Sequence, residues 1–309
     1  MNSRIGDVFD TGLKGLIIFF LILIFNSGYL LCDWLPETRL SKDIRTSTTS
    51  PANQSDIVVD NLGDIHVVWL DDRNTLGVFE IYYKKYSKSG GWGPETRLTF
   101  DLTTYDSEGK PVKKSETKAD PGIAVDSTGN LYVSFENKVT KTPNVLRCDG
   151  KTGKWELFPT ILGTGGLTGI NVVLSVDKSS NVHALWLGLV SSKPQMFYAQ
   201  YAAGSWTTAQ QITTLSSQKQ TPTLAVDKQG NIHAAWADSR DSTSPVKYEI
   251  YYKKKPASGS WGKDTRLSFA LASDSLKPCI TVSSSGDLHL AYQDDRHGNF
   301  EIYYLFKPT

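Results

Sequence analysis

The sequence of 309 residues predicts an all-β fold, and three observations support this prediction. First, a long unit repeats, and its first turn recurs as DNLGD, DSTGN, DKSSN, DKQGN and SSSGD, starting at residues 60, 126, 177, 227 and 283. Second, each unit contains short runs of β-branched and aromatic residues between Gly, Asp, Asn and Ser turns. Third, the string PETRL ends the first unit at 94–98 and also stands alone at 36–40, whereas the last unit lacks it. Together they predict a five-bladed β-propeller, closed by pairing of the N-terminal strand into the last blade.

Each blade is predicted to contain four antiparallel strands. In the fourth unit the candidates are PTLAVD (222–227), IHAAWAD (232–238), YEIYYKK (248–254) and WGKDTRLS (261–268), with no helical periodicity between them. One four-stranded sheet cannot bury both of its faces, so neighbouring blades must cover one another within a single domain, residues 33–309. The expected blades are about 54–99, 121–161, 170–213, 222–268 and 278–309, the last completed by 33–41.

An apolar run, LIIFFLILIF, lies ahead of this domain at residues 16–25, preceded by Arg4 and Lys14. Ten residues fit the core of a signal peptide and fall short of the roughly 20 that span a bilayer. We therefore predict that residues 1–32 are a signal peptide and that the protein is secreted, at the cell surface or periplasmic. The alternatives are a membrane anchor over residues 15–32 and lipidation at Cys32.

Charge and cysteine content limit the possible partners. The formal net charge is +1 at pH 7, and no basic stripe suggests nucleic-acid binding. Cys148 and Cys279 fall in non-adjacent blades, so two buried thiols are expected instead of a disulfide. We expect a monomer without cofactor or metal, whose partner is an extracellular carbohydrate or protein.

The succession IAVDxxGNIHVxWxDxR, EIYY and a Gly turn leading to Trp resembles the bacterial sialidase-like propellers, which are described by Asp-box (BNR-type) repeats. The hairpins at 86–92, 202–206 and 257–261 lie where that family has its Asp-box, and they keep Ser, Gly and Trp without the central Asp. The resemblance covers residues 33–309 and implies a propeller. Its enzymes use an arginine cluster, a tyrosine nucleophile assisted by glutamate, and an aspartate acid/base. The Arg-Ile-Pro string typical of that family is absent, so we expect no sialidase activity.

Three arginines occupy one repeat position: Arg73, Arg240 and Arg296. The blades that carry them also carry Glu80, Glu249 and Glu301, while the other two blades have neither Arg nor Glu at these two repeat positions. This correlation predicts an Arg–Glu pair across the strands of each hairpin. The aspartates two residues earlier, Asp71, Asp238 and Asp294, are expected to accept backbone N–H bonds in their loops. The alternative is that the three arginines face a ligand.

Four histidines also share one repeat position: His66, His183, His233 and His289. This predicts a common hydrogen bond to neighbouring backbone, because a catalytic or metal site needs unlike residues that converge on one point. His297 lies outside the pattern and is expected in an exposed loop.

Departures from the repeat indicate where a ligand would bind. The longest is the connection at 100–120, which should share a face with the Asp-x-Arg loops. Asp72 and Asp295 are not required by the proposed hairpin pairs. We predict a ligand rim at residues 71–79, 100–120, 238–247 and 294–299. Its predicted ligand-binding residues, with no catalytic residue among them, are Asp72, Arg73, Arg240, Asp295, Arg296 and His297.

The sequence thus predicts an exported, non-catalytic propeller that binds an extracellular carbohydrate or protein. One alternative is a glycoside hydrolase of the sialidase-like class, favoured if paired carboxylates lie near the mouth of the ring. A second alternative is a structural surface-display protein, because fold alone does not fix function.

Overall fold

A computed structural model describes residues 37–41, 55–100, 102–105, 107–108, 110–114, 116–163, 169–242, 245–270 and 272–309. The chain divides into two units, Met1–Lys42 and Asp43–Thr309. In the first unit, residues 37–41 form no strand. The expected leader, Trp34 and the rest of the expected closing strand lie outside the described residues. Within the described ranges, the structure contains no helix with the length and hydrophobicity that a membrane crossing requires.

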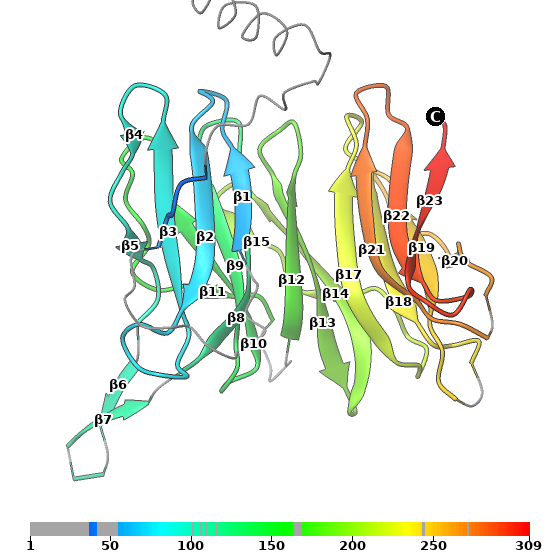
Figure 1. The fold of residues 1–309 in the computed structure, drawn as a ribbon, viewed down its shortest axis with the longest axis horizontal. Helices are drawn as coiled ribbons and strands as arrows, with labels where there is room; N and C mark the ends of the chain where they lie inside the picture. The colour runs from blue at the N-terminus through cyan, green and yellow to red at the C-terminus, as the bar shows by residue number, and fades with distance from the viewer. Residues whose placement is uncertain are drawn as a thin grey trace, which may run out of the picture. The chain divides into compact units, whose positions relative to one another are not determined.

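The second unit consists of five antiparallel sheets that follow one another along the chain (Figure 1). The first contains β1 (Ser55–Val59), β2 (Ile65–Asp71) and β3 (Glu80–Ser87), with β4 (Gly91–Trp92) and β5 (Thr96–Arg97) both paired to β3. The second runs through β8 (Lys118–Val125), β9 (Leu131–Asn137), β10 (Thr142–Cys148) and β11 (Thr160–Ile161). Along the chain, a hairpin of β6 (Leu102–Tyr105) and β7 (Pro111–Lys114) connects these two sheets.

The other three sheets repeat this order. The third contains β12 (Gly169–Val176), β13 (Val182–Val190) and β14 (Lys193–Ala202), with β15 (Ser205–Trp206) and β16 (Gln210–Gln211) paired to β14. The fourth contains β17 (Lys219–Val226), β18 (Ile232–Asp238), β19 (Glu249–Lys255) and β20 (Thr265–Arg266). The fifth has three strands, β21 (Ser275–Val282), β22 (Leu288–Asp294) and β23 (Glu301–Lys307). The predicted all-β architecture of repeated antiparallel sheets is confirmed, and ring closure stays a prediction.

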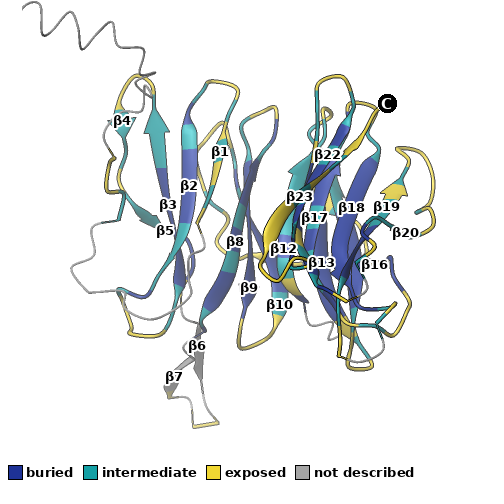
Figure 2. Cartoon of the chain, turned by 45° about the vertical axis from the view of Figure 1, so that its right-hand side comes forward, coloured by how far each residue is buried: buried dark blue, intermediate teal, exposed yellow. Residues whose placement is uncertain are grey.

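Packing between consecutive sheets forms the core. The first strands lie side by side, and apolar clusters fill each junction between neighbouring sheets. At one repeat position, Ile123 and Ile280 are each 7% exposed because the preceding sheet covers them, whereas Ile57 of the first sheet is 61% exposed. At the opposite end, Ile302 of β23 is 77% exposed. Figure 2 shows the same contrast between the exposed β23 and the buried β18. The two ends of the array therefore present uncovered apolar faces.

The two expected thiols differ in exposure. Cys148 is buried at the junction of the first two sheets, as predicted, but Cys279 is exposed on β21. The prediction that Cys279 is buried is wrong because side chains alternate along a strand, and its neighbour Ile280 points into the core instead.

The repeated histidines form a side-chain network with the first turn. Asp60 accepts the backbone N–H groups of Leu62 and Asp64, both at 2.9 Å, which closes the turn. Its second carboxylate oxygen lies 3.2 Å from His66 Nε2, and Nδ1 of that ring lies 2.8 Å from the Tyr83 hydroxyl. The third and fourth sheets repeat the triad at His183 and His233, and His289 keeps the tyrosine contact. The role is structural as predicted, but the expected backbone partner is wrong, because the turn carboxylate and the tyrosine hydroxyl occupy both ring nitrogens.

This network should make stability depend on pH. Burial lowers the pKa of His66, His183 and His233 because it disfavours the charged imidazolium. Protons then bind more readily to the unfolded chain, so the free energy of unfolding should fall as the pH drops below about 6.5. The turn aspartates Asp60, Asp177 and Asp227 have lowered pKa values, so a further loss should follow below about pH 4.

Urea unfolding at about pH 7.5 and about pH 5.5 measures the first loss. His233→Gln, which removes one titrating group, should reduce the difference between the two pH values. His297→Ala should leave it unchanged, because His297 is exposed. Equal stability of the parent protein at both pH values would contradict this account.

Candidate functional site

The predicted ligand face contains the loops after the second strands and the connections between sheets. The long connection at 100–120 emerges at this end of the strands as the β6–β7 hairpin (Figure 1). The first turns and the β3–β4 hairpin lie at the opposite end, as the antiparallel order of the strands requires. The expectation that the insertion and the Asp-x-Arg loops share a face is confirmed.

Each Asp-x-Arg loop is closed by its own hydrogen bonds. The backbone N–H groups of Arg73, Arg240 and Arg296 donate to the aspartates two residues earlier at 2.9, 3.0 and 2.9 Å, as predicted. Each guanidinium also donates to that same carboxylate. It lies over a tyrosine ring of the third strand at 4.0–4.3 Å from the centroid. The three arginines therefore stay in their own sheets and do not converge on one cavity.

The predicted pairing of these arginines with Glu80, Glu249 and Glu301 is wrong. Asp71 lies directly opposite Glu80 in the β2–β3 ladder, so their two carboxylates face each other. Each carboxylate pairs with a different arginine side chain. Arg73 reaches Glu95, and Arg97 instead binds Glu80 at 3.1 Å. The fourth sheet repeats this arrangement, with Arg240 bound to Asp264 at 2.6 Å and Arg266 bound to Glu249 at 2.7 Å.

The fourth strand explains why Arg and Glu are lost together in the second and third sheets. Where the first and fourth sheets have Arg97 and Arg266, the second and third sheets have Ile161 and Gln211. The described part of the fifth sheet has three strands, and there Glu301 contacts His297 at 3.1 Å. Among the described residues, the Arg296 guanidinium donates to groups of its own sheet, Asp294 and the Tyr292 hydroxyl.

The remaining predicted ligand residues also have partners of their own. Asp72 is buried and accepts the backbone N–H of Gly77 at 3.0 Å, so its side chain is turned into its own loop. Asp295 accepts the backbone N–H of Asp274 at 2.6 Å. His297 is exposed, as expected, with its Nδ1 3.0 Å from the Tyr303 hydroxyl. Ligand contact by any of these residues stays a prediction.

A groove of about 450 Å³ lies on the predicted face between the first and second sheets, where the insertion returns to β8. Large apolar side chains stand at its edge: Phe100, Leu157 and Phe158 are 63%, 89% and 74% exposed. Polar side chains are buried in its floor, among them Asn137 and Asn144. An apolar wall over a few polar groups is the usual composition of a small-molecule site.

Two residues of the groove floor, Glu116 and Lys118, come from the end of the insertion. The Lys118 ammonium donates to the Glu116 carbonyl oxygen at 2.6 Å and lies 3.5 Å from its carboxylate, so both buried charges are compensated. Nearby Glu80 is buried and accepts from Arg97 and Thr99, and burial raises its pKa. The floor thus offers hydrogen-bonding groups without an unpaired buried charge.

The repeat pattern predicts the insertion but not the opposite wall of the groove. Leu157 and Phe158 lie in WELFPTI, in the segment where the first and fourth sheets have WGPETR and WGKDTR. Counted from the shared tryptophan, these two large apolar residues stand where the fourth sheet has Lys263 and Asp264. Such a departure from the repeat is of the kind that marks a binding surface.

A second missed feature is a buried carboxylate at the junction of the second and third sheets. Glu136 is 3% exposed and holds the Lys138 ammonium at 2.9 Å. The other sheets place Leu70, Leu187, Ala237 and Gln293 at this position. Burial raises the pKa of Glu136, and repulsion from nearby Asp120 raises it further. Asp120 sits at the bulge of β8 with φ 50° and accepts from Asn171 of the third sheet at 3.0 Å.

Comparison with solved structures identifies the fold. An alpha-L-arabinanase of Penicillium chrysogenum aligns with 83% of this chain and 80% of its own, at 11% identity and TM-score 0.52. An alpha-L-arabinofuranosidase of Fusarium graminearum aligns with 86% and 84%, at 10% identity and TM-score 0.53. A PL25 ulvan lyase gives TM-score 0.55 at 11% identity, and the alignment covers 81% of this chain but only 63% of the lyase.

These neighbours are β-propellers, and at such low identity the likeness establishes the fold alone. No protein-family model matches the sequence, and no curated protein sequence is similar to it.

Proposed function

We propose that this protein is an exported β-propeller that binds a carbohydrate chain in the groove between its first two sheets. The observation that carries the proposal is the groove itself, because exposed Phe100 and Phe158 flank a floor of buried amide and carboxylate groups. The apolar faces of sugar rings pack on aromatic side chains, while their hydroxyls bond to such polar groups. Export rests on the apolar run at 16–25.

The structural neighbours support a saccharide over a protein ligand. Two of them were solved with a bound saccharide, arabinobiose in the arabinanase and a GlcA–Rha3S unit in the ulvan lyase. The Asp-x-Arg loops bear on the charge of the ligand. Their arginines are paired within their own sheets and do not form a shared cationic cluster for an acidic ligand. A neutral or weakly charged polysaccharide is therefore the expected ligand.

Replacing both Phe100 and Phe158 by alanine should weaken polysaccharide binding at least about tenfold, because a loss of roughly 1.4 kcal/mol has that effect. Binding can be measured by affinity electrophoresis in gels that contain arabinan, a neutral polysaccharide. Folding should persist, since both side chains are mostly exposed. Phe269→Ala is the matched control: Phe269 is 73% exposed and lies 4.9 Å from Arg266, as Phe100 does from Arg97, but it is outside the groove. Equal retardation of the double variant and the parent would contradict the proposed site.

A second candidate function is glycoside hydrolysis or polysaccharide cleavage at the junction of the second and third sheets. The observation that favours it is the pair Glu136 and Asp120, two neighbouring carboxyls in different environments. A buried carboxyl with a raised pKa suits a general acid, and Asp120 would then serve as the base or nucleophile. Lys138, bound to Glu136 at 2.9 Å, would stabilise negative charge there.

The release of new reducing ends from arabinan and ulvan tests the second candidate. If Glu136 is the acid, Glu136→Gln should reduce turnover at least about 100-fold, the low end of what a general acid contributes. Glu156→Gln, at an exposed position, should have no effect. Absence of turnover by the parent protein, together with binding in the gel assay, would contradict the second candidate function and support the non-catalytic proposal.

The proposal includes a ring of five blades closed by residues 34–41 as the fourth strand of the fifth sheet. A local hydrogen bond supports this: Arg39 Nε donates to the Ser41 carbonyl at 2.7 Å, as Arg97 does to Thr99 and Arg266 to Ser268 in the first and fourth sheets. By the same correspondence, Glu37 would take the role of Glu95 beside Arg296, and Arg39 the role of Arg97 beside Glu301. Closure would also cover the exposed ends of the array at Ile57 and Ile302.

A chain beginning at residue 44 should unfold roughly 5–10 °C below one beginning at residue 33, since each kcal/mol lost lowers the midpoint by about 2–4 °C in a domain of this size. Charge exchange gives a sharper test. Glu301→Arg should destabilise the full chain, and Arg39→Glu in the same chain should restore part of the loss. Similar midpoints for the two chain lengths would contradict closure by this strand.

A further inference from the structure

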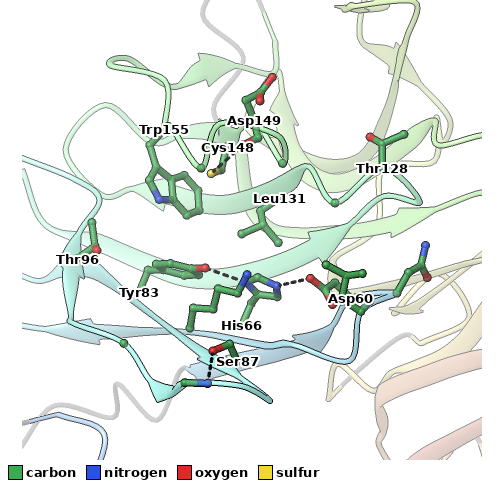
Figure 3. A pocket seen from close by; sticks show the side chains of 18 of the residues that line it. Asp60, His66, Tyr83, Ser87, Thr96, Thr128, Leu131, Cys148, Asp149 and Trp155 are labelled. Atoms are coloured by element: carbon green, nitrogen blue, oxygen red, sulfur yellow. Dashed lines mark hydrogen bonds and ion pairs between the residues drawn. The ribbon is translucent and has the colours of Figure 1, made fainter.

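A second cavity lies between the same two sheets, at the end of the strands opposite the groove. Its volume is about 790 Å³, within the range of roughly 300–1,000 Å³ typical of ligand sites. Its walls come from the first turns, around Asp60 and Thr128, and from the hairpins that lead into the fourth strands. In Figure 3, Trp155 stands over Tyr83, with Cys148 and Leu131 beside them. The structure therefore contains a partly apolar chamber at the end of the strands that carries none of the predicted ligand-binding residues.

The cavity exists because one residue of the repeat is small. Cys148 lies opposite Leu131 in the β9–β10 ladder, and the corresponding residues of the other third strands are Tyr86, Tyr201, Lys255 and Lys307. In the third sheet Tyr201 fills the junction with the second sheet, with its ring 5.5 Å from both Tyr132 and Trp206. In the second sheet the corresponding residue is Cys148, and its small thiol does not fill the volume that a tyrosine would occupy. The cavity lies beside Trp155, which pairs with Cys148 in an isolated bridge.

Glycines keep the chamber open to solvent. Gly91 and Gly153 line it on opposite sides, and a Cβ at either position would meet no atom within 4 Å. Both have positive φ, 69° and 67°, so their tight turns also favour glycine over other residues. Trp155, which lines the cavity with these two glycines, is half-buried.

The chemistry of the walls defines the ligand class. The floor is aromatic and aliphatic, with Trp155 against the edge of Tyr83 at 5.1 Å between ring centroids. Side-chain hydroxyl and amide groups of Ser127, Thr128 and Asn61 stand at the rim, where Asn61 donates to the Ser127 carbonyl at 3.1 Å and holds the two sheets together. Each charged residue of the lining has partners of its own: Lys85 has Asp64 at 2.8 Å, and Asp60 has its turn and His66. Asp149 accepts the backbone N–H of Thr152 at 2.9 Å and lies 3.8 Å from Arg147.

We infer that this cavity is a second saccharide-binding site, which takes a short neutral oligosaccharide with one sugar ring packed on Trp155. The aromatic floor matches the apolar face of a sugar ring, and the neutral polar rim matches its hydroxyls. A ligand with a net charge would have to compete with the partners that the charged residues of these walls already have. The inference does not depend on the groove, because the two sites share no lining residue. A protein with both sites would hold a polysaccharide at two points and gain avidity.

The test uses the protein from residue 33 onward and an array of short arabino-, cello-, malto- and xylo-oligosaccharides, followed by calorimetric titration of the best binder. Cys148→Tyr restores the residue of the first and third sheets and fills the chamber without removing a polar group. It should abolish oligosaccharide binding or weaken it at least tenfold while leaving the unfolding midpoint unchanged or raised. Trp155→Ala should also abolish binding, and it serves as the second variant if the tyrosine variant does not fold.

Two controls test whether a loss of binding is specific. Phe269→Ala should leave oligosaccharide binding unchanged, because Phe269 lines neither this cavity nor the groove. Cys279→Ser should behave as the parent, which excludes a general effect of thiol loss. Absence of binding across the array, or undiminished binding by a folded Cys148→Tyr variant, would overturn the inference. Loss of binding in Phe158→Ala with retention in Cys148→Tyr would assign the oligosaccharide to the groove instead.

Discussion

The structure depends on one constraint, namely that each sheet can bury its faces only against its neighbours. Leu224 and Ile280, whose preceding sheets are present, are 8% and 7% exposed, while the corresponding Ile57 of the first sheet is 61% exposed. The same residue type in the same strand position therefore gains or loses its hydrophobic stabilisation according to whether another sheet lies beside it. This makes the repeats mutually dependent, and it explains why apolar residues such as Ile57 and Ile302 are exposed at the two ends of the array.

The charged repeat residues compensate one another within a sheet. Asp71 lies opposite Glu80, so two carboxylates face each other. The fourth strand supplies Arg97, which pairs with Glu80, and Glu95, which pairs with Arg73. Such pairs fix the outer strand on the third strand through side chains, where the backbone pairing covers only two residues. They occupy the guanidinium groups that would otherwise suit an anionic ligand. The arginines of the Asp-x-Arg loops are thus already paired within their own sheets.

The proposed functional features lie where single residues break the repeat. Glu136 replaces an apolar or neutral residue, Cys148 replaces Tyr or Lys, and Leu157 with Phe158 replaces a polar or charged segment. All belong to the second sheet, which therefore carries the buried acid and contributes to both cavities. In a repeat protein the packing rules are satisfied by the shared pattern, so departures from it are free to serve binding or chemistry.

The sequence by itself determined the local elements. The strands, the aspartate turns, the hairpins before the fourth strands and the loop bonds of Asp71, Asp238 and Asp294 follow from residue types within about ten positions of each other. Tertiary structure decided which side chains meet across sheets and across long connections. The partner of Glu80 lies 17 residues away on the fourth strand, and His66 meets the Tyr83 hydroxyl instead of backbone. Glu136 is buried only because a neighbouring sheet packs over it. The space beside Cys148 exists only because this small residue leaves it unfilled. Such contacts depend on three-dimensional proximity, which a linear pattern of residue types does not encode.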